Sequence, residues 1–122
     1  MLNKLRYILK KRLLRSVEDE YDVDLNQLKN MQKQGTIILD VRSPQEYKEG
    51  HLNGAILIPE YEIRKRAEKE LKNKEETIIV YCRSGARSKK AQKELKELGY
   101  TKVYNLYNGI ENYWGFSNFM LK

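Results

Sequence analysis

The sequence predicts a single α/β domain whose central sheet is mainly parallel and flanked by helices. Apolar, β-branched segments alternate with amphipathic helical segments, a pattern typical of parallel strands joined by helical crossovers. Residues 36–41 and 77–81 are rich in apolar, β-branched side chains, as expected for strands buried on both faces. A chain of 122 residues has the size of one domain and can bury a core without disulfides or metals.

The first 17 residues differ from the rest in charge, so we predict two units, residues 1–17 and residues 18–122. The first unit contains six of the 24 basic residues and no acidic residue, which leaves 18 basic against 17 acidic residues in the second. The net charge of +7 therefore belongs mostly to the first unit. The near-neutral second unit argues against a nucleic-acid-binding function.

The first unit is predicted to be an extra N-terminal amphipathic helix. Leucines recur at helical spacings over residues 1–16, between basic side chains. The segment has no uninterrupted apolar run, so it resembles neither a spanning helix nor a signal peptide. We favour a helix that packs on the domain. Contact with an anionic membrane surface is a weaker alternative, and a docking or dimerisation arm is the third.

Capping and turn residues predict the elements that follow. Residues 16–22 are acidic and are expected to link the two units. Asp24 is a predicted N-cap for a helix that ends at Gly35. The Ser-Pro-Gln-Glu sequence at residues 43–46 forms a capping box with proline at the first helical position, and Gly50 ends this short helix.

The second half of the chain continues the alternation of strands and helices. Strands are predicted at residues 55–58, 77–81 and 102–106. Helices are predicted around residues 63–71, after Cys82 as far as Gly99, and at residues 110–114. The apolar tail residues Phe116, Phe119, Met120 and Leu121 are expected to pack on the domain.

Cys82 is the only cysteine, and it stands between a predicted strand and the helix that follows. The free N–H groups and the positive dipole end of a helix N-terminus favour a thiolate, and Arg83 and Arg87 act in the same direction. An inert buried cysteine is the alternative, but it requires neither a glycine three residues later nor two nearby arginines. We therefore expect a nucleophile. A single reactive thiol also predicts a reducing compartment, the cytoplasm.

The residues after Cys82 form a predicted cradle for an anion. Gly85 permits a tight turn that brings backbone N–H groups close to a ligand, and Ser84 and Ser88 add hydroxyl donors. The only histidine, His51, falls in a predicted turn and is expected to bond to the local backbone. One cysteine and one histidine argue against a zinc or iron–sulfur site within the chain.

Three segments together resemble the rhodanese family. Residues 40–55, Asp-Val-Arg-Ser-Pro-Gln-Glu-Tyr-Lys-Glu-Gly-His-Leu-Asn-Gly-Ala, resemble its first signature, and residues 82–88, Cys-Arg-Ser-Gly-Ala-Arg-Ser, resemble its active-site loop. Residues 109–114 resemble its closing segment. The similarity covers approximately residues 21–115, so the resemblance implies a single rhodanese-like domain.

The resemblance implies a thiosulfate sulfurtransferase that needs no cofactor or metal. Cys82 would accept a sulfane sulfur from a small anionic donor such as thiosulfate and pass it, as a persulfide, to cyanide or a thiol. Asp40 and Arg42 would support the loop by charge pairing, with partners that the sequence does not assign. The donor and the persulfide would be held by Arg83, Ser84, Gly85, Ala86, Arg87 and Ser88.

Two other functions remain open at this point. The domain could carry or sense a persulfide for a partner protein that accepts sulfur, without turning over small acceptors. A phosphatase or an arsenate reductase is less favoured, because only four residues separate Cys82 from Arg87. The phosphatases that resemble this family have one residue more in that loop.

Overall fold

The computed structural model describes residues 20–113 and 120–121, and it has the predicted α/β architecture. The main sheet has the strand order β1-β6-β5-β2-β4, and every pair in it is parallel. Its strands are β1 (Asp22–Val23), β2 (Ile37–Asp40), β4 (Ile56–Leu57), β5 (Thr77–Tyr81) and β6 (Lys102–Leu106). Two further short strands, β3 (His51–Leu52) and β7 (Met120–Leu121), pair antiparallel.

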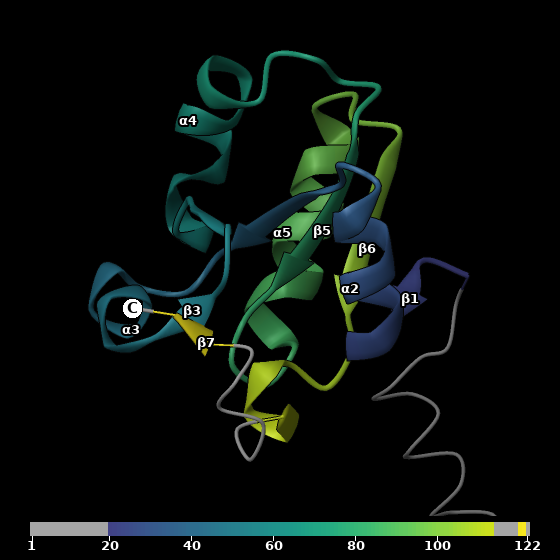
Figure 1. The fold of residues 1–122 in the computed structure, drawn as a ribbon. Coiled ribbons are helices and arrows are strands. Elements are labelled where there is room, and N and C mark those ends of the chain that lie inside the picture. The colour runs from purple at the N-terminus through teal and green to yellow at the C-terminus, as the bar shows by residue number, and fades with distance from the viewer. Residues whose placement is uncertain (1–19, 114–119, 122) are drawn as a thin grey trace, which may run out of the picture.

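Helices cover both faces of the main sheet (Figure 1). Helices α4 (Ile63–Glu70) and α5 (Ala86–Glu97) bury their apolar side chains against one face, and α2 (Leu25–Lys33) packs on the other. The remaining elements are α3 (Pro44–Glu49) and the 3₁₀ turns η1 (Glu60–Glu62) and η2 (Ile110–Tyr113). Both faces of the central strands are therefore covered, which explains their nearly continuous apolar sequence.

The predicted N-cap at Asp24 and the predicted capping box at Ser43 are both present, and the Asp24 cap is also a capping box. The Asp24 side chain accepts a hydrogen bond from the Gln27 N–H at the start of α2, and Ser43 accepts one from the Glu46 N–H at the start of α3. In each case the third helical side chain bonds back to the N-cap N–H. These bonds satisfy backbone donors that a helix start leaves free.

Some expectations are corrected or fall outside the described residues. Asp22 belongs to β1 rather than to a linker, because it pairs in register with Asn105 of β6. His51 lies in β3 rather than in a turn. Its Nδ1 lies 2.8 Å from the Tyr47 carbonyl oxygen, which agrees with the expected bond to the local backbone. The predicted helix of residues 1–17, residue 114, Phe116 and Phe119 lie outside the described residues. No helix in the described part of the chain is long and apolar enough to cross a membrane.

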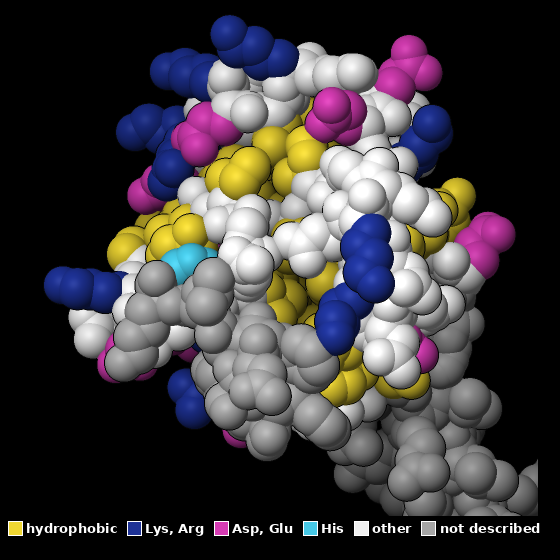
Figure 2. Space-filling view, viewed as in Figure 1, with side chains coloured by type: hydrophobic (Ala, Val, Ile, Leu, Met, Phe, Trp, Pro, Cys, Tyr) yellow, Lys and Arg dark blue, Asp and Glu magenta, His cyan; other side chains and the backbone are white. Residues whose placement is uncertain are grey.

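Charges of both signs are mixed on the surface. Around α4, Arg66 forms ion pairs with Glu62 at 2.8 Å and with Glu70 at 2.6 Å, as i,i+4 neighbours do on a solvated helix. Figure 2 shows Lys and Arg side chains interspersed with Asp and Glu side chains over this part of the molecule. The lysine-rich segment at residues 65–74 is therefore a solvated helix face as far as Glu70, and Lys74, beyond the end of α4, forms an ion pair with Glu68.

Candidate active site

Cys82 directly follows β5 at the carboxyl end of the parallel strands, where α/β sheets place their ligands. Its side chain continues the alternation of Ile78 and Val80 and lies in the core cluster beneath α4 and α5. Cys82 is 1% exposed. The sulfur therefore lies at the base of a loop rather than on the surface.

Backbone N–H groups of the loop converge on this sulfur, as the sequence predicts. The Gly85 N–H donates to the Cys82 Sγ at 3.0 Å, and the Ser88 N–H donates to it at 3.3 Å. The thiol in turn donates to the Ser88 Oγ at 3.4 Å. Both N–H groups point their positive ends at the sulfur and stabilise negative charge there.

Gly85 makes this geometry possible. It is the N-cap of α5 with φ of 108°, a conformation that L side chains rarely adopt. Helix α5 therefore begins immediately after the turn, with its free N–H groups next to Cys82. The Ser88 hydroxyl donates to the Gly85 carbonyl oxygen at 3.1 Å, which closes the turn.

The η2 segment packs directly on the loop. The Ile110 N–H donates to the Cys82 carbonyl oxygen and the Glu111 N–H donates to the Arg83 carbonyl oxygen, both at 2.9 Å. Gly109 has φ of 70°, and a Cβ there would lie 2.2 Å from the Arg83 carbonyl oxygen. Gly109 was not among the predicted site residues. Its only sequence signal is its place in the segment that resembles the family's closing motif.

Arg87 and Arg83 both lie near a carboxylate that the sequence analysis did not assign to the site. The Arg87 guanidinium donates to both carboxylate oxygens of Glu46, at 2.7 and 3.0 Å. Arg83 lies 3.9 Å from Glu46 and 4.0 Å from Glu111. The bond from Arg87 lowers the pKa of Glu46 to about 2, and the same bond raises the pKa of Arg87. Glu46 is therefore ionised throughout the neutral range.

Asp40 and Arg42 pair with each other, and both are buried. The Arg42 Nη2 lies 2.7 Å from the Asp40 Oδ2, and it also donates to the Gly50 carbonyl oxygen at 2.7 Å. Burial is the largest single influence and lowers the pKa of Arg42, but the hydrogen bond to Asp40 and the nearby negative charges together outweigh it, so the pKa of Arg42 is raised. Asp40 is the last residue of β2, at the carboxyl end of the strand as predicted, but it faces α2 rather than the side occupied by Cys82.

Tyr81 connects this pair to β5, the strand that Cys82 follows. Its hydroxyl donates to the Asp40 Oδ2 at 2.7 Å and accepts from the Leu52 N–H at 3.0 Å, and its side chain is fully buried. Burial and the Asp40 carboxylate raise the pKa of Tyr81, so the hydroxyl stays protonated. Because Cys82 follows Tyr81, this network holds the end of β5 from the opposite face of the sheet. Sequence reasoning assigned Tyr81 only to the strand.

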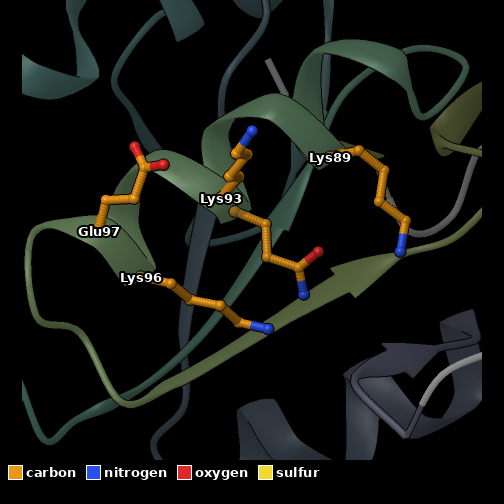
Figure 3. Close-up of a pocket in the computed structure, with 5 residues that line it drawn as sticks. Lys89, Lys93, Lys96 and Glu97 are labelled. Carbon is orange, nitrogen blue, oxygen red and sulfur yellow. The ribbon is translucent and has the colours of Figure 1, made fainter.

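A separate hollow of about 390 Å³ lies along α5 (Figure 3). It is lined by Lys89, Gln92, Lys93, Lys96 and Glu97, and by no residue of the loop. Lys89 lies 3.0 Å from Asp22, and the Lys96 Nζ lies 4.2 Å from the centre of the Tyr21 ring. These lysines already have partners within the chain, so the hollow is not the candidate active site.

Comparisons with known proteins agree with this geometry. The family model of the rhodanese-like domain matches residues 24–115. The chain is 42% identical over 67 residues to the thiosulfate sulfurtransferase PspE of Escherichia coli, a match that covers 55% of this chain and 64% of that protein. It is 41% identical over 78 residues to the putative sulfur carrier protein YrkF of Bacillus subtilis, covering 64% of this chain and 41% of YrkF.

A solved structure described as a rhodanese with anions from E. coli superimposes with a TM-score of 0.57 and 38% identity, and the match covers 60% of this chain and 86% of that one. The matches to PspE and YrkF each cover less than two thirds of that relative's own length. The family match itself covers most of the chain, and the chain belongs to the rhodanese-like domain family.

Proposed function

We propose that this protein is a sulfurtransferase that moves a sulfane sulfur from an anionic donor, such as thiosulfate, to cyanide or a thiol through a persulfide on Cys82. The observation that carries the proposal is the convergence of the Gly85 and Ser88 N–H groups on the Cys82 sulfur. A sulfur held in this way is stabilised as a thiolate, the form that attacks sulfur. The similarity to PspE supports the same reaction.

The reaction consists of two displacements at sulfur. The Cys82 thiolate attacks the outer sulfur of thiosulfate, the donor's S–S bond breaks, and sulfite leaves with the electron pair. The new S–S bond makes Cys82 a persulfide. Cyanide or a thiolate then attacks the outer sulfur of that persulfide, and the Cys82 thiolate leaves. No external oxidant or reductant is needed, because the sulfane sulfur keeps its oxidation state.

Each part of the loop has a role in this proposal. The Gly85 and Ser88 N–H groups hold the inner sulfur. The remaining loop amides, from Arg83, Ser84, Ala86 and Arg87, would hold the outer sulfur and the donor oxygens, and the two arginines would attract the anion. Asp40 and Arg42 act through Tyr81 by fixing the end of the strand. A cytoplasmic location fits a thiol that has to stay reduced.

A second candidate is a persulfide carrier that passes its sulfur only to a partner protein. The similarity to the putative sulfur carrier YrkF favours it. Both functions need the Cys82 persulfide. They differ in whether cyanide or a small thiol discharges it at a useful rate.

Intact-protein mass spectrometry tests the proposal. After incubation with thiosulfate we expect a gain of one sulfur, about 32 Da, and its loss on addition of cyanide. The Cys82→Ser variant should keep its fold and gain no sulfur, since it lacks the nucleophile. Persistent thiosulfate sulfurtransferase activity in that variant would contradict the mechanism. A persulfide that survives cyanide would favour the carrier.

A further inference from the structure

The entrance to the Cys82 loop carries balanced charges among the described residues. Arg83 and Arg87 are the two cations within the loop at residues 82–88, and Glu46 and Glu111 are the acids that lie within 4.0 Å of them. Arg87 bonds to both oxygens of Glu46, and Arg83 lies within 4.0 Å of each acid. An approaching donor therefore meets two positive and two negative groups rather than a positive surface.

Glu46 is held firmly in this position. Its Oε1 accepts from the Ser43 N–H at 3.1 Å and from the Ser43 Oγ at 3.0 Å, in addition to the bond from Arg87. Its side chain is 18% exposed, so little of it is free to turn away. The carboxylate thus occupies the edge of the Arg87 guanidinium that could otherwise donate hydrogen bonds to the oxygens of an anionic donor.

We infer that Glu46, with Glu111, determines donor specificity: the two acids weaken the binding of a dianion such as thiosulfate relative to a persulfide carried by an amino acid or a peptide. This inference rests on the proposed function. Each acid lies within 4.0 Å of an arginine, so a dianion that is attracted by the two arginines is also repelled by the two carboxylates, and its net attraction to these side chains is reduced. An amino-acid persulfide carries an ammonium group that the two acids would attract and a carboxylate that Arg83 would attract.

The transfer from such a donor is balanced. The Cys82 thiolate attacks the outer sulfur of R–S–SH, a new S–S bond forms on Cys82, and the S–S bond of the donor breaks. The leaving thiolate R–S⁻ takes the electron pair and is protonated by solvent. The products are the Cys82 persulfide and a free thiol, and no other reactant is consumed.

The Glu46→Gln variant separates charge from structure. Glutamine at the third helical position preserves the capping box with Ser43, and its amide oxygen can still accept a bond from Arg87. The change removes the negative charge and also the second hydrogen bond, which the Arg87 Nη2 donates to the other carboxylate oxygen. The matched control is Glu97→Gln, because Glu97 also accepts a hydrogen bond from an arginine, Arg64, but lies at the far end of α5, about 16 Å along the helix from the loop.

We would measure kcat and KM for persulfide formation on Cys82 with thiosulfate and with cysteine persulfide. In Glu46→Gln we expect kcat/KM for thiosulfate to rise by on the order of tenfold, mostly through KM, and that for cysteine persulfide to fall, because the acid that would hold its ammonium group loses its charge. The more exposed Glu111→Gln should show the same selectivity with a smaller rise. Glu97→Gln should match the wild type with both donors.

Two results would overturn the inference. An unchanged kcat/KM for thiosulfate in both loop variants would show that the acids do not oppose the dianion. An equal loss with both donors in Glu46→Gln would show that Glu46 serves only to position Arg87. Failure of every donor to persulfidate the wild-type Cys82 would be a different result, because it would refute the proposed function itself.

Discussion

Gly109→Ala tests whether the close contact between η2 and the Cys82 loop is required for stability and for persulfide formation. The added Cβ would lie 2.2 Å from the Arg83 carbonyl oxygen, 2.4 Å from the Arg83 carbonyl carbon and 2.6 Å from the Ser84 nitrogen. The closest of these is roughly 1 Å short of ordinary contact, and all three atoms are backbone. The loop or η2 therefore has to move.

The expected loss of stability has two parts. A positive φ costs an alanine about 1–2 kcal/mol relative to glycine. The overlap with the Arg83–Ser84 peptide adds about 1–3 kcal/mol. Gly35→Ala is the matched control, because Gly35 also has a positive φ, 98°, but a Cβ there would have nothing within 4 Å. The Gly35→Ala variant should therefore lose only the stability that the positive φ costs an alanine.

Urea denaturation of both variants, with persulfide formation from thiosulfate measured in parallel, checks this prediction. Gly109→Ala should be the less stable of the two by about 1–3 kcal/mol, with an unchanged m value. We also expect its rate of persulfide formation to fall by more than about tenfold, since moving the Arg83–Ser84 peptide disturbs the amides around the sulfur. Gly35→Ala should keep the wild-type rate. Equal stability losses and equal rates in the two variants would refute this reasoning.

Three further predictions concern the network, the ionised acid and the arm. Tyr81→Phe should reduce the free energy of unfolding by about 1–3 kcal/mol in urea denaturation, because it removes a buried hydroxyl bonded to Asp40; a loss below about 0.5 kcal/mol would contradict this. The pKa of Glu46 is lowered from 4.5 to about 2, so its bond to Arg87 should stabilise the fold above pH 4.5 and lose that effect as the pH falls towards 2. The difference in unfolding free energy between the wild type and Glu46→Gln, followed from pH 6 to 2, should shrink over this window, and a constant difference would argue against the shift. Deleting residues 1–16 should leave the thiosulfate activity largely unchanged, whereas a large loss of activity or stability would show that this segment is part of the domain.

Local sequence rules predict much of this fold because they describe interactions within a few residues. Asp24 and Ser43 cap helices through bonds to residues three positions away. Strands β5 and β6 have the predicted bounds, and the apolar, β-branched sequence of β5 leaves little alternative to a buried strand. The turn at Gly85 follows from the need for a positive φ at the entry of α5.

The errors and omissions involve contacts between distant parts of the chain. Strand β1 has only two residues, and it exists because β6 offers an edge to pair with. Nothing near Tyr81 in the sequence indicates that its hydroxyl bonds to Asp40, which is 41 residues away. The pair of Arg42 with Asp40 is local, but the segments at residues 40–55 and 82–88 contain three acids and three arginines, which left several pairings open.

Glu46 illustrates why a functional residue can escape sequence analysis. Its role in the capping box with Ser43 fully explains an acidic residue at the third position of α3, so no unexplained feature is left to notice. The fold then brings Arg87 against the same carboxylate from 41 residues away, and one side chain caps a helix, orients an arginine and sets the charge beside Cys82. These roles differ in what they require: glutamine satisfies the cap and can accept the arginine's bond, but only a carboxylate supplies the charge. The comparison of Glu46→Gln with the wild type therefore tests the negative charge, a role that the local sequence could not reveal.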